Sequence, residues 1–284
     1  MNPQEHHNAT ASIGEIISAA NQLSGDQIER IVSYQKSQGV RFGEAAVALG
    51  LAKREDVLWA LSQQFDYPYA NGSIGPELQC ALQPFSQQAE AIRSLRSQLI
   101  GGALTLGASK RPLAILSPCQ GDGKTYIAAN LAISLSQMGA KVALVDADMR
   151  TPRQHQVFQM TDVRTGLSSV LASRGEITMV RPIDSLPTLY LMPVGITPPN
   201  PLELIQRPAF GELLSALLVK FDHVIVDTPA ADHGSDARSI AQACQNVLLV
   251  GRKDHTRTKQ MNRFIDSIKG TVGHIAGMVM NEHA

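Results

Sequence analysis

Cysteine is scarce in this sequence, and the residues present are not arranged for disulfide bonds or for zinc. Only Cys80, Cys119 and Cys244 occur among the 284 residues. A disulfide framework or a zinc site needs paired cysteines at close spacing. The sequence therefore predicts three reduced thiols in a reducing cytosol.

The sequence also lacks an excess charge and a long hydrophobic run. Its 25 basic residues equal its 25 acidic residues in number, so nucleic acid is not an expected partner. No apolar run approaches the roughly 20 residues that span a bilayer, and the polar first residues do not resemble a signal peptide. We expect a cytoplasmic chain without a membrane span, for which any membrane association requires a partner.

An internal repeat occupies the first part of the chain. Aligning the sequence from Ile13 with the sequence from Phe42 superimposes Gly14 on Gly43, and apolar residues recur at helical spacing in both copies. Each copy is predicted to form a pair of helices, and neither pair can bury its apolar face alone. Two pairs are therefore expected to form one small all-helical domain.

Sequence composition divides the chain into four segments. Residues 1–11 are expected to be a disordered tail, and the helical domain is placed at residues 12–70. Turn-forming pairs such as Asn71-Gly72 and Gly75-Pro76 predict a linker over residues 71–85. Residues 86–284 form the second predicted domain.

This second domain alternates short β-branched runs with amphipathic helices. The expected strands are Leu113–Ser117, Val142–Asp146, Leu189–Met192, His223–Asp227, Val247–Gly251 and His274–Asn281, and two of the expected helices are Thr125–Met138 and Pro208–Lys220. Such alternation predicts an α/β fold with a mainly parallel sheet flanked by helices. Ligands bind such sheets beyond the carboxyl ends of the strands.

A phosphate-binding loop follows the first predicted strand. The sequence from Ser117 to Thr125 ends in Gly121-Asp122-Gly123-Lys124-Thr125 and runs into a helix. Glycines let the backbone wrap around phosphates, a lysine neutralises them and a Thr hydroxyl ligates Mg²⁺. Pro118 replaces the first glycine of the usual P-loop pattern. The pattern predicts a P-loop NTPase that binds ATP and Mg²⁺.

Three carboxylates follow other predicted strands. Asp146 and Asp148 end the second strand, and Asp227 ends a later one. Carboxylates at strand ends beside a phosphate loop suit Mg²⁺, usually through water. The alternative is that each of these carboxylates caps a helix that follows its strand.

These elements together resemble the bacterial protein-tyrosine kinases of exopolysaccharide synthesis. The segment Asp146–Phe158 matches the family's second acidic motif, and Gly166-Leu-Ser168 and Gly195–Leu204 match further family sequences. Glu90, Arg93 and Arg96 are spaced like the family's assembly motif. The resemblance extends from about Ala89 to Asn281. It implies a tyrosine kinase-type regulator of exopolysaccharide chain length, polymerisation or export.

The resemblance also implies roles for individual residues. Lys124, Asp146, Asp148 and Asp227 form the predicted catalytic set, with Asp146 as the base that accepts the tyrosine proton. Thr125, Asp148 and Asp227 are predicted to hold the metal. The predicted nucleotide-binding residues are Gly121, Asp122, Gly123, Lys124, Thr125, Tyr126, Arg150 and Asn281, although a structural ion pair is an equal alternative for Arg150. Glu90, Arg93 and Arg96 are predicted to build a ring-like homo-oligomer.

Family members work with a membrane protein, so the resemblance implies a transmembrane partner of the polysaccharide co-polymerase type. The chain would be peripheral to the inner membrane through that partner. The family usually carries a tyrosine-rich tail, whereas no tyrosine follows Tyr190 here. Autophosphorylation of a tail is therefore not expected. An assembly or positioning ATPase of the MinD/ParA type and a nucleotide-gated scaffold are alternatives.

The repeated helical domain resembles the N-terminal domain of type II secretion and pilus-assembly ATPases. Arg41-Phe-Gly43 and Leu58–Gln64 carry this likeness. Some domains of that kind bind cyclic di-GMP, and Gly14, Gly43 and Arg41 are the candidate contacts. Ser12 stands where the first copy would need an arginine. Docking of a protein partner is the alternative function.

Overall fold

The computed structural model describes residues 12–64, 74–104, 110–173 and 179–282. The chain divides into two compact units, one ending at residue 69 and the other beginning at residue 70. The predicted tail at residues 1–11 lies outside the described residues, as does the start of the predicted linker.

The first unit consists of four helices, α1 (Ile13–Ala20), α2 (Gly25–Gln38), α3 (Phe42–Ala48) and α4 (Arg54–Gln64). The two repeats interlock, because α1 packs against α4 while α2 packs against α3. Their shared core contains the fully buried residues Ile17, Ile31, Ala45, Ala46 and Ala60. The arrangement explains why one helix pair would not suffice.

The four helices also begin in the same way. At each start, the backbone N–H of one residue donates a hydrogen bond to a side chain three positions later. The pairs are Ser12–Glu15, Ser24–Gln27, Arg41–Glu44 and Lys53–Asp56. These bonds satisfy backbone donors that a helix leaves free at its first turn. The repeat is therefore one of local structure as well as of sequence.

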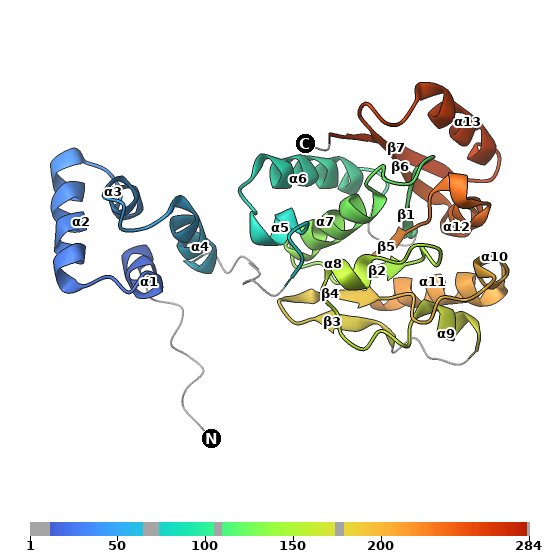
Figure 1. Ribbon diagram of the computed structural model, residues 1–284, viewed down its shortest axis with the longest axis horizontal. Helices are drawn as coiled ribbons and strands as arrows, with labels where there is room; N and C mark the ends of the chain where they lie inside the picture. The colour runs from blue at the N-terminus through green and yellow to red at the C-terminus, as the bar shows by residue number, and fades with distance from the viewer. Residues whose placement is uncertain (1–11, 65–73, 105–109, 174–178, 283–284) are drawn as a thin grey trace, which may run out of the picture. The chain divides into compact units, whose positions relative to one another are not determined.

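The second unit contains a seven-stranded sheet in the order β3-β4-β2-β5-β1-β6-β7 (Figure 1). The strands are β1 (Leu113–Leu116), β2 (Val142–Asp146), β3 (Arg181–Ile183), β4 (Leu186–Met192), β5 (His223–Asp227), β6 (Asn246–Arg252) and β7 (His274–Asn281). All neighbours pair in parallel except β3, which is antiparallel to β4. The predicted mainly parallel sheet is confirmed.

Helices cover both faces of this sheet, and alternate residues of the strands face opposite sides. On one face, Leu113, Ile115 and the buried residues of the other strands on that face form a core with three helices. These helices are α5 (Gln79–Leu82), α6 (Gln87–Ile100) and α7 (Lys124–Ser136). The core on the other face joins Ala114, Leu116 and their counterparts to α9 (Leu167–Leu171), α10 (Pro201–Ile205), α11 (Pro208–Lys220), α12 (Asp236–Cys244) and α13 (Thr258–Ile268). The remaining short helices are α8 (Gln154–Val157) and η2 (Ala231–His233).

The predicted linker requires a correction, because its described part belongs to the second unit. Residues 74–85 include α5, where Cys80 is fully buried. The amide of Asn130 accepts from the backbone N–H of Cys80 at 2.9 Å, and Gln137 donates to its carbonyl at 2.7 Å. Turn-forming residues marked this segment as a linker, but buried apolar side chains, the amide of Asn130 in α7 and the amide of Gln137 just after α7 hold it against the sheet domain.

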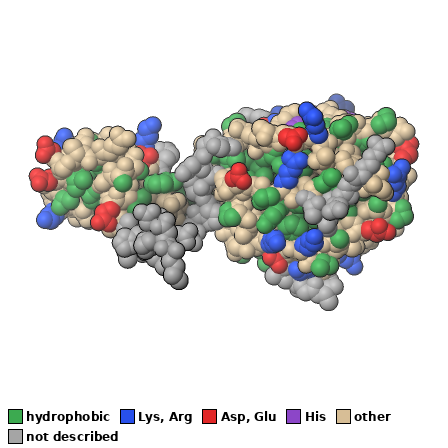
Figure 2. All heavy atoms as spheres, turned by 90° about the horizontal axis from the view of Figure 1, so that it is seen from below, with side chains coloured by type: hydrophobic (Ala, Val, Ile, Leu, Met, Phe, Trp, Pro, Cys, Tyr) green, Lys and Arg blue, Asp and Glu red, His purple; other side chains and the backbone are tan. Residues whose placement is uncertain are grey.

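The surface shows no gathering of one charge on the face in Figure 2. Lys and Arg side chains of the described residues are scattered there among Asp and Glu. None of the helices in the described part of the chain combines the length and apolar character that crossing a bilayer requires.

Candidate active site

The phosphate-binding loop connects β1 to α7, at the carboxyl edge of the sheet. Gly121 and Gly123 both have positive φ angles, of 82° and 99°. A Cβ atom at Gly123 would lie only 2.1 Å from the Asn281 side-chain nitrogen, so a larger residue would displace Asn281 and would also be strained by the positive φ. The loop leads the chain into the N-terminus of α7, whose free N–H groups favour an anion.

Lys124 is the first residue of α7, and its side chain is almost entirely buried. Its Nζ donates a hydrogen bond of 2.9 Å to Oγ of Ser117 at the end of β1. The ammonium also lowers the pKa of Asp227 by its charge. Lys124 therefore places a positive charge between the loop and the acidic edge of the sheet.

The three predicted carboxylates lie at the ends of neighbouring strands, since Asp146 of β2 pairs in register with Asp227 of β5. Asp146 is fully buried. One of its oxygens accepts from the backbone of Asp148, and the other accepts from the backbones of Arg153 and Gln154. Its carboxylate thus shapes the loop that follows β2.

Asp148 has a different environment. It is also hydrogen-bonded, by the backbones of Arg150 and Thr151 and by the Thr151 hydroxyl. It retains 6% exposure and lines a cavity of about 1130 Å³. Neither Asp146 nor Asp227 lines that cavity. Of the three carboxylates, Asp148 is the one that can touch a ligand without rearrangement.

Burial raises the pKa of two of these carboxyls. The pKa of Asp146 lies well above its ordinary value, first because of desolvation and second because of the charge of Asp227. Desolvation raises the pKa of Asp227 to about 6, although Lys124 lowers it. A cation bound at this edge would relieve the repulsion and favour the ionised forms.

The cavity extends from the phosphate loop between α6 and the end of β7. Of the predicted nucleotide-binding residues, Gly121, Gly123, Lys124, Thr125, Tyr126 and Asn281 line it. The α6 residues Ala91, Ile92 and Leu95 and the β7 residues Val279 and Met280 add apolar walls. The structure therefore brings most of the predicted set together around one cavity large enough for a nucleotide.

Two predicted nucleotide-binding side chains have protein partners instead. The Asp122 carboxylate accepts from Thr256 Oγ1 at 2.6 Å, contacts His255 Nδ1 at 3.0 Å and accepts from the Cys119 backbone. It fastens the phosphate loop to the segment between β6 and α13. Arg150 forms an ion pair of 2.8 Å with the buried Asp236, in accord with the structural alternative.

Sequence reasoning missed several of these supporting residues. Thr256 and Asp236 are distant in sequence from the groups they hold and belong to no recognisable motif, whereas Gln154 lies within the matched segment Asp146–Phe158 but was given no role. Gln154 is the most central of them, because its side chain donates to both Asp227 and the carbonyl of Thr125. Only the position of Gln154 shortly after Asp148 could have drawn attention to it.

The predicted assembly residues lie on α6, and the two arginines bind within the chain. Arg93 pairs with Glu90 at 2.6 Å and donates to the carbonyl of Pro84. Arg96 donates to the carbonyl and hydroxyl oxygens of Ser134 on α7. The Glu90 side chain is 66% exposed, so of the three it is the most available to a second chain.

Comparisons with known proteins agree with this geometry. Residues 108–284 match the ParA family, described as NUBPL iron-transfer P-loop NTPase. The chain is 30% identical over 176 residues to the tyrosine-protein kinase CpsD of Streptococcus agalactiae serotype III, a match that covers 62% of this chain and 76% of CpsD.

Solved structures distinguish the tyrosine-kinase interpretation from the MinD/ParA interpretation. The kinase domain of Escherichia coli tyrosine kinase ETK matches with a TM-score of 0.69 and 28% identity, over 75% of this chain and 82% of that domain. MinD of Pyrococcus horikoshii, complexed with Mg-ADP, matches with a TM-score of 0.53 and 25% identity, over 60% of this chain and 70% of MinD. The kinase likeness is closer and longer, so it supports the kinase reading more than the MinD reading.

The P-loop relatives imply ATP and Mg²⁺, and the donors present suit the ion. No group of three or more His, Cys, Asp or Glu side chains in the described ranges could hold a metal by itself. The clustered carboxylates at the ends of β2 and β5 and the Thr125 hydroxyl are hard oxygen donors, which Mg²⁺ prefers. Mg²⁺ commonly completes its shell with water and phosphate oxygens, so a site of this kind fits.

Proposed function

Since the chain belongs to the bacterial tyrosine-protein kinases within the ParA-like P-loop NTPases, we propose that it transfers the γ-phosphoryl group of ATP to tyrosine residues of a protein. In this proposal it regulates exopolysaccharide chain length, polymerisation or export. The observation that carries the proposal is the meeting of Lys124, Thr125 and Asp148 at one cavity, in a chain whose similarity to a kinase domain exceeds its similarity to MinD.

The chain's own residues provide positioning and charge. The N–H groups at the start of α7 and the Lys124 ammonium bind the phosphates, and the glycines let the backbone approach them. Thr125, Asp148 and Asp227 would hold Mg²⁺, directly or through water. A bound ion would supply charge neutralisation on the phosphate oxygens.

The proton of the tyrosine hydroxyl needs an acceptor beside the cavity. Asp146 was the sequence-based candidate, but it is fully buried, is bonded to the loop that follows β2 and does not line the cavity. Asp146 could accept the proton only if this loop moved. We therefore assign the proton-accepting role to Asp148, which lines the cavity.

An assay that distinguishes phosphoryl transfer to tyrosine from hydrolysis of ATP tests the proposed function. The chain is incubated with γ-labelled ATP, Mg²⁺ and a synthetic polymer that contains tyrosine. Label in phosphotyrosine supports the kinase. Release of free phosphate alone would indicate the MinD-like positioning ATPase, and nucleotide binding without turnover would indicate a nucleotide-gated scaffold.

The kinase is proposed to act with a transmembrane partner of the polysaccharide co-polymerase type and to lie at the cytoplasmic side of the inner membrane through it. Family membership supports this proposal, and a partner of that type would supply the membrane contact. Co-purification of the chain with membranes only when such a partner is co-expressed would support it.

Assembly into a homo-oligomeric ring is proposed to involve the exposed Glu90. Glu90→Ala is expected to weaken association about tenfold in Mg-ATP, because an interfacial ion pair would be lost, and light scattering measures the change. Arg96→Ala is a poorer test, since Arg96 ties α6 to α7. Glu212→Ala, at an exposed position of α11, is the matched control. Equal masses for wild type and Glu90→Ala at every concentration would contradict this role.

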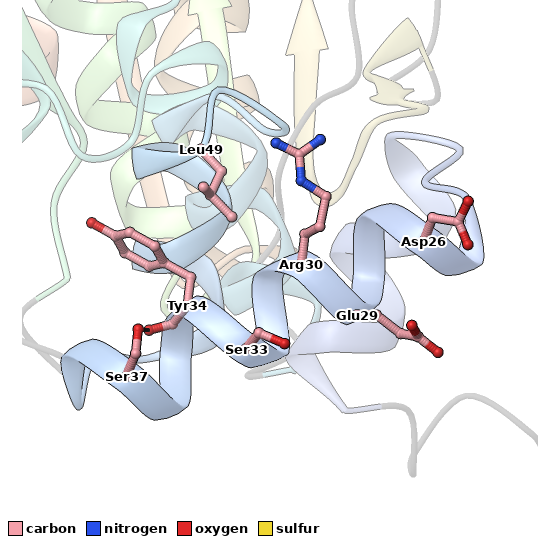
Figure 3. Close-up of a pocket in the computed structure, with 7 residues that line it drawn as sticks. All are labelled: Asp26, Glu29, Arg30, Ser33, Tyr34, Ser37 and Leu49. Atoms are coloured by element: carbon pink, nitrogen blue, oxygen red, sulfur yellow. Dashed lines mark hydrogen bonds between the residues drawn. The ribbon is translucent and has the colours of Figure 1, made fainter.

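The first unit is proposed to dock a protein partner rather than to bind cyclic di-GMP. A Cβ atom at Gly14 would meet the Phe42 ring at 3.6 Å, and one at Gly43 would meet Val57 at 2.6 Å. Gly43 thus serves close helix packing, whereas a Cβ at Gly14 would make only an ordinary contact. The open pocket of this unit is lined instead by Asp26, Glu29, Arg30, Ser33, Tyr34, Ser37 and Leu49 (Figure 3).

Two carboxylates beside one arginine make that pocket unfavourable for a doubly charged phosphate ligand. Titration of the full chain with cyclic di-GMP is therefore expected to give no heat and no change in melting temperature. Binding that disappears in Arg41→Ala would contradict this expectation and establish the nucleotide as the ligand. The exposed Lys36→Ala, on α2, is the control.

A further inference from the structure

One buried polar atom beside the active site has no hydrogen-bond partner. Gln154 at the start of α8 is fully buried. Its side-chain nitrogen has two N–H groups, and both are used, by Asp227 Oδ2 at 2.9 Å and by the Thr125 carbonyl at 3.2 Å. Its Oε1 atom is buried without a partner among the described residues. An unsatisfied buried acceptor of this kind calls for an explanation.

Exchange of the amide nitrogen and oxygen does not remove the problem. The two atoms near the amide nitrogen are a carboxylate oxygen and a carbonyl oxygen, and both are acceptors. Turning the amide would bring its oxygen against them and leave three acceptors facing one another. The nitrogen therefore points to Asp227 and Thr125, and the oxygen is the atom that lacks a donor.

Gln154 also joins the three elements that build the site. Its side chain connects Asp227 at the end of β5 to Thr125 in the first turn of α7. Its backbone N–H donates to Asp146 at the end of β2, at 3.0 Å. The residue is therefore placed where the predicted metal-holding groups converge, and its unpartnered oxygen belongs to the amide whose nitrogen holds Asp227.

We propose that Gln154 is a positioning residue for Mg²⁺ in the ATP site. Its amide nitrogen holds the Asp227 carboxylate and the Thr125 turn at a fixed separation. Its amide oxygen accepts a hydrogen bond from a water molecule in the shell of the ion, which supplies the missing donor. This inference rests on the proposed function, because it requires that the site bind Mg²⁺ with a nucleotide.

The test compares wild type with Gln154→Met, which keeps the length of the side chain and removes its polar atoms. Melting temperatures are measured without ligand, with ADP alone and with ADP during a Mg²⁺ titration. The Mg²⁺ concentration for half-maximal stabilisation is expected to rise about tenfold or more, as for loss of one hydrogen bond to a charged group. Stabilisation by ADP alone should stay close to that of wild type.

A merely structural role would lower the melting temperature in all three conditions without changing the Mg²⁺ dependence, and that result would overturn the proposal. Gln156→Met, at an exposed position of the same short helix, is the matched control. Gln154→Leu provides a second variant if methionine prevents folding.

If neither variant folds, the side-chain amide signal of Gln154 in the wild-type ADP complex decides the question. The signal should move when Mg²⁺ is added, and an unchanged signal would refute the role. Failure of the proposed function gives a distinct result: without nucleotide binding, wild type itself would show no stabilisation by ADP and Mg²⁺, and without kinase activity alone, the Mg²⁺ response would persist while the tyrosine polymer stays unlabelled.

Discussion

Lys124→Met is expected to reduce ATP turnover at least about 100-fold while the chain remains folded. Lys124 is the buried cation of the phosphate loop, 2.9 Å from Ser117, and methionine fills similar space without its charge. Loss of one preorganised group that stabilises the transition state typically costs about 10²–10³ in rate. The rate is measured as phosphate release at saturating Mg-ATP, beside circular dichroism of both proteins.

Lys220→Met is the matched control, because Lys220 is exposed at the end of α11. It should turn over ATP at the wild-type rate. Comparable turnover by folded Lys124→Met and wild type would remove the assignment of this loop to ATP.

Asp227→Asn is expected to stabilise the ligand-free protein near pH 7.5 and to abolish Mg²⁺-dependent turnover. Burial raises the pKa of the Asp227 carboxyl to about 6, whereas an unfolded aspartate titrates near about 3.9. The folded state therefore binds this proton more tightly. The difference corresponds to a free energy of unfolding on the order of 2–3 kcal/mol.

The sign of the pH dependence follows from that raised pKa. The contribution to stability is fully present below the unfolded pKa and is lost as pH rises through about 6. The variant should therefore melt several degrees above wild type at pH 7.5, and the two should converge as pH falls toward about 4. Melting curves across this range check the effect, with the exposed Asp266→Asn as control. A variant that melts below wild type at pH 7.5 would contradict this electrostatic account.

Local patterns made much of the second unit predictable. Glycines, lysine and threonine in a fixed order mark the turn between β1 and α7, and runs of apolar residues mark strands that are covered on both faces. The ends of β2 and β5 are equally local features, so their carboxylates could be placed at one edge of the sheet. The strand β3 was missed because it has only three residues, Arg181–Ile183, and contains a proline.

Tertiary partners could not be predicted in the same way. The sequence does not reveal that Asp122 turns toward Thr256, that Arg150 pairs with Asp236, or that Arg96 reaches Ser134. Each contact joins residues brought together only by the packing of the sheet and its helices. The described part of the predicted linker became α5 for the same reason, since Asn130 and Gln137 of the neighbouring segment bind its backbone.

The most direct test of the kinase proposal measures phosphotyrosine. The full chain is incubated with γ-labelled ATP, Mg²⁺ and a tyrosine-containing polymer, and the label is followed in polymer and in free phosphate. Wild type is predicted to label tyrosine, while Lys124→Met and Asp148→Asn, both folded, are predicted to lose the labelling. ATP hydrolysis by wild type with no phosphotyrosine in the polymer or in the chain itself, even with a co-polymerase-type membrane partner present, would contradict the proposal.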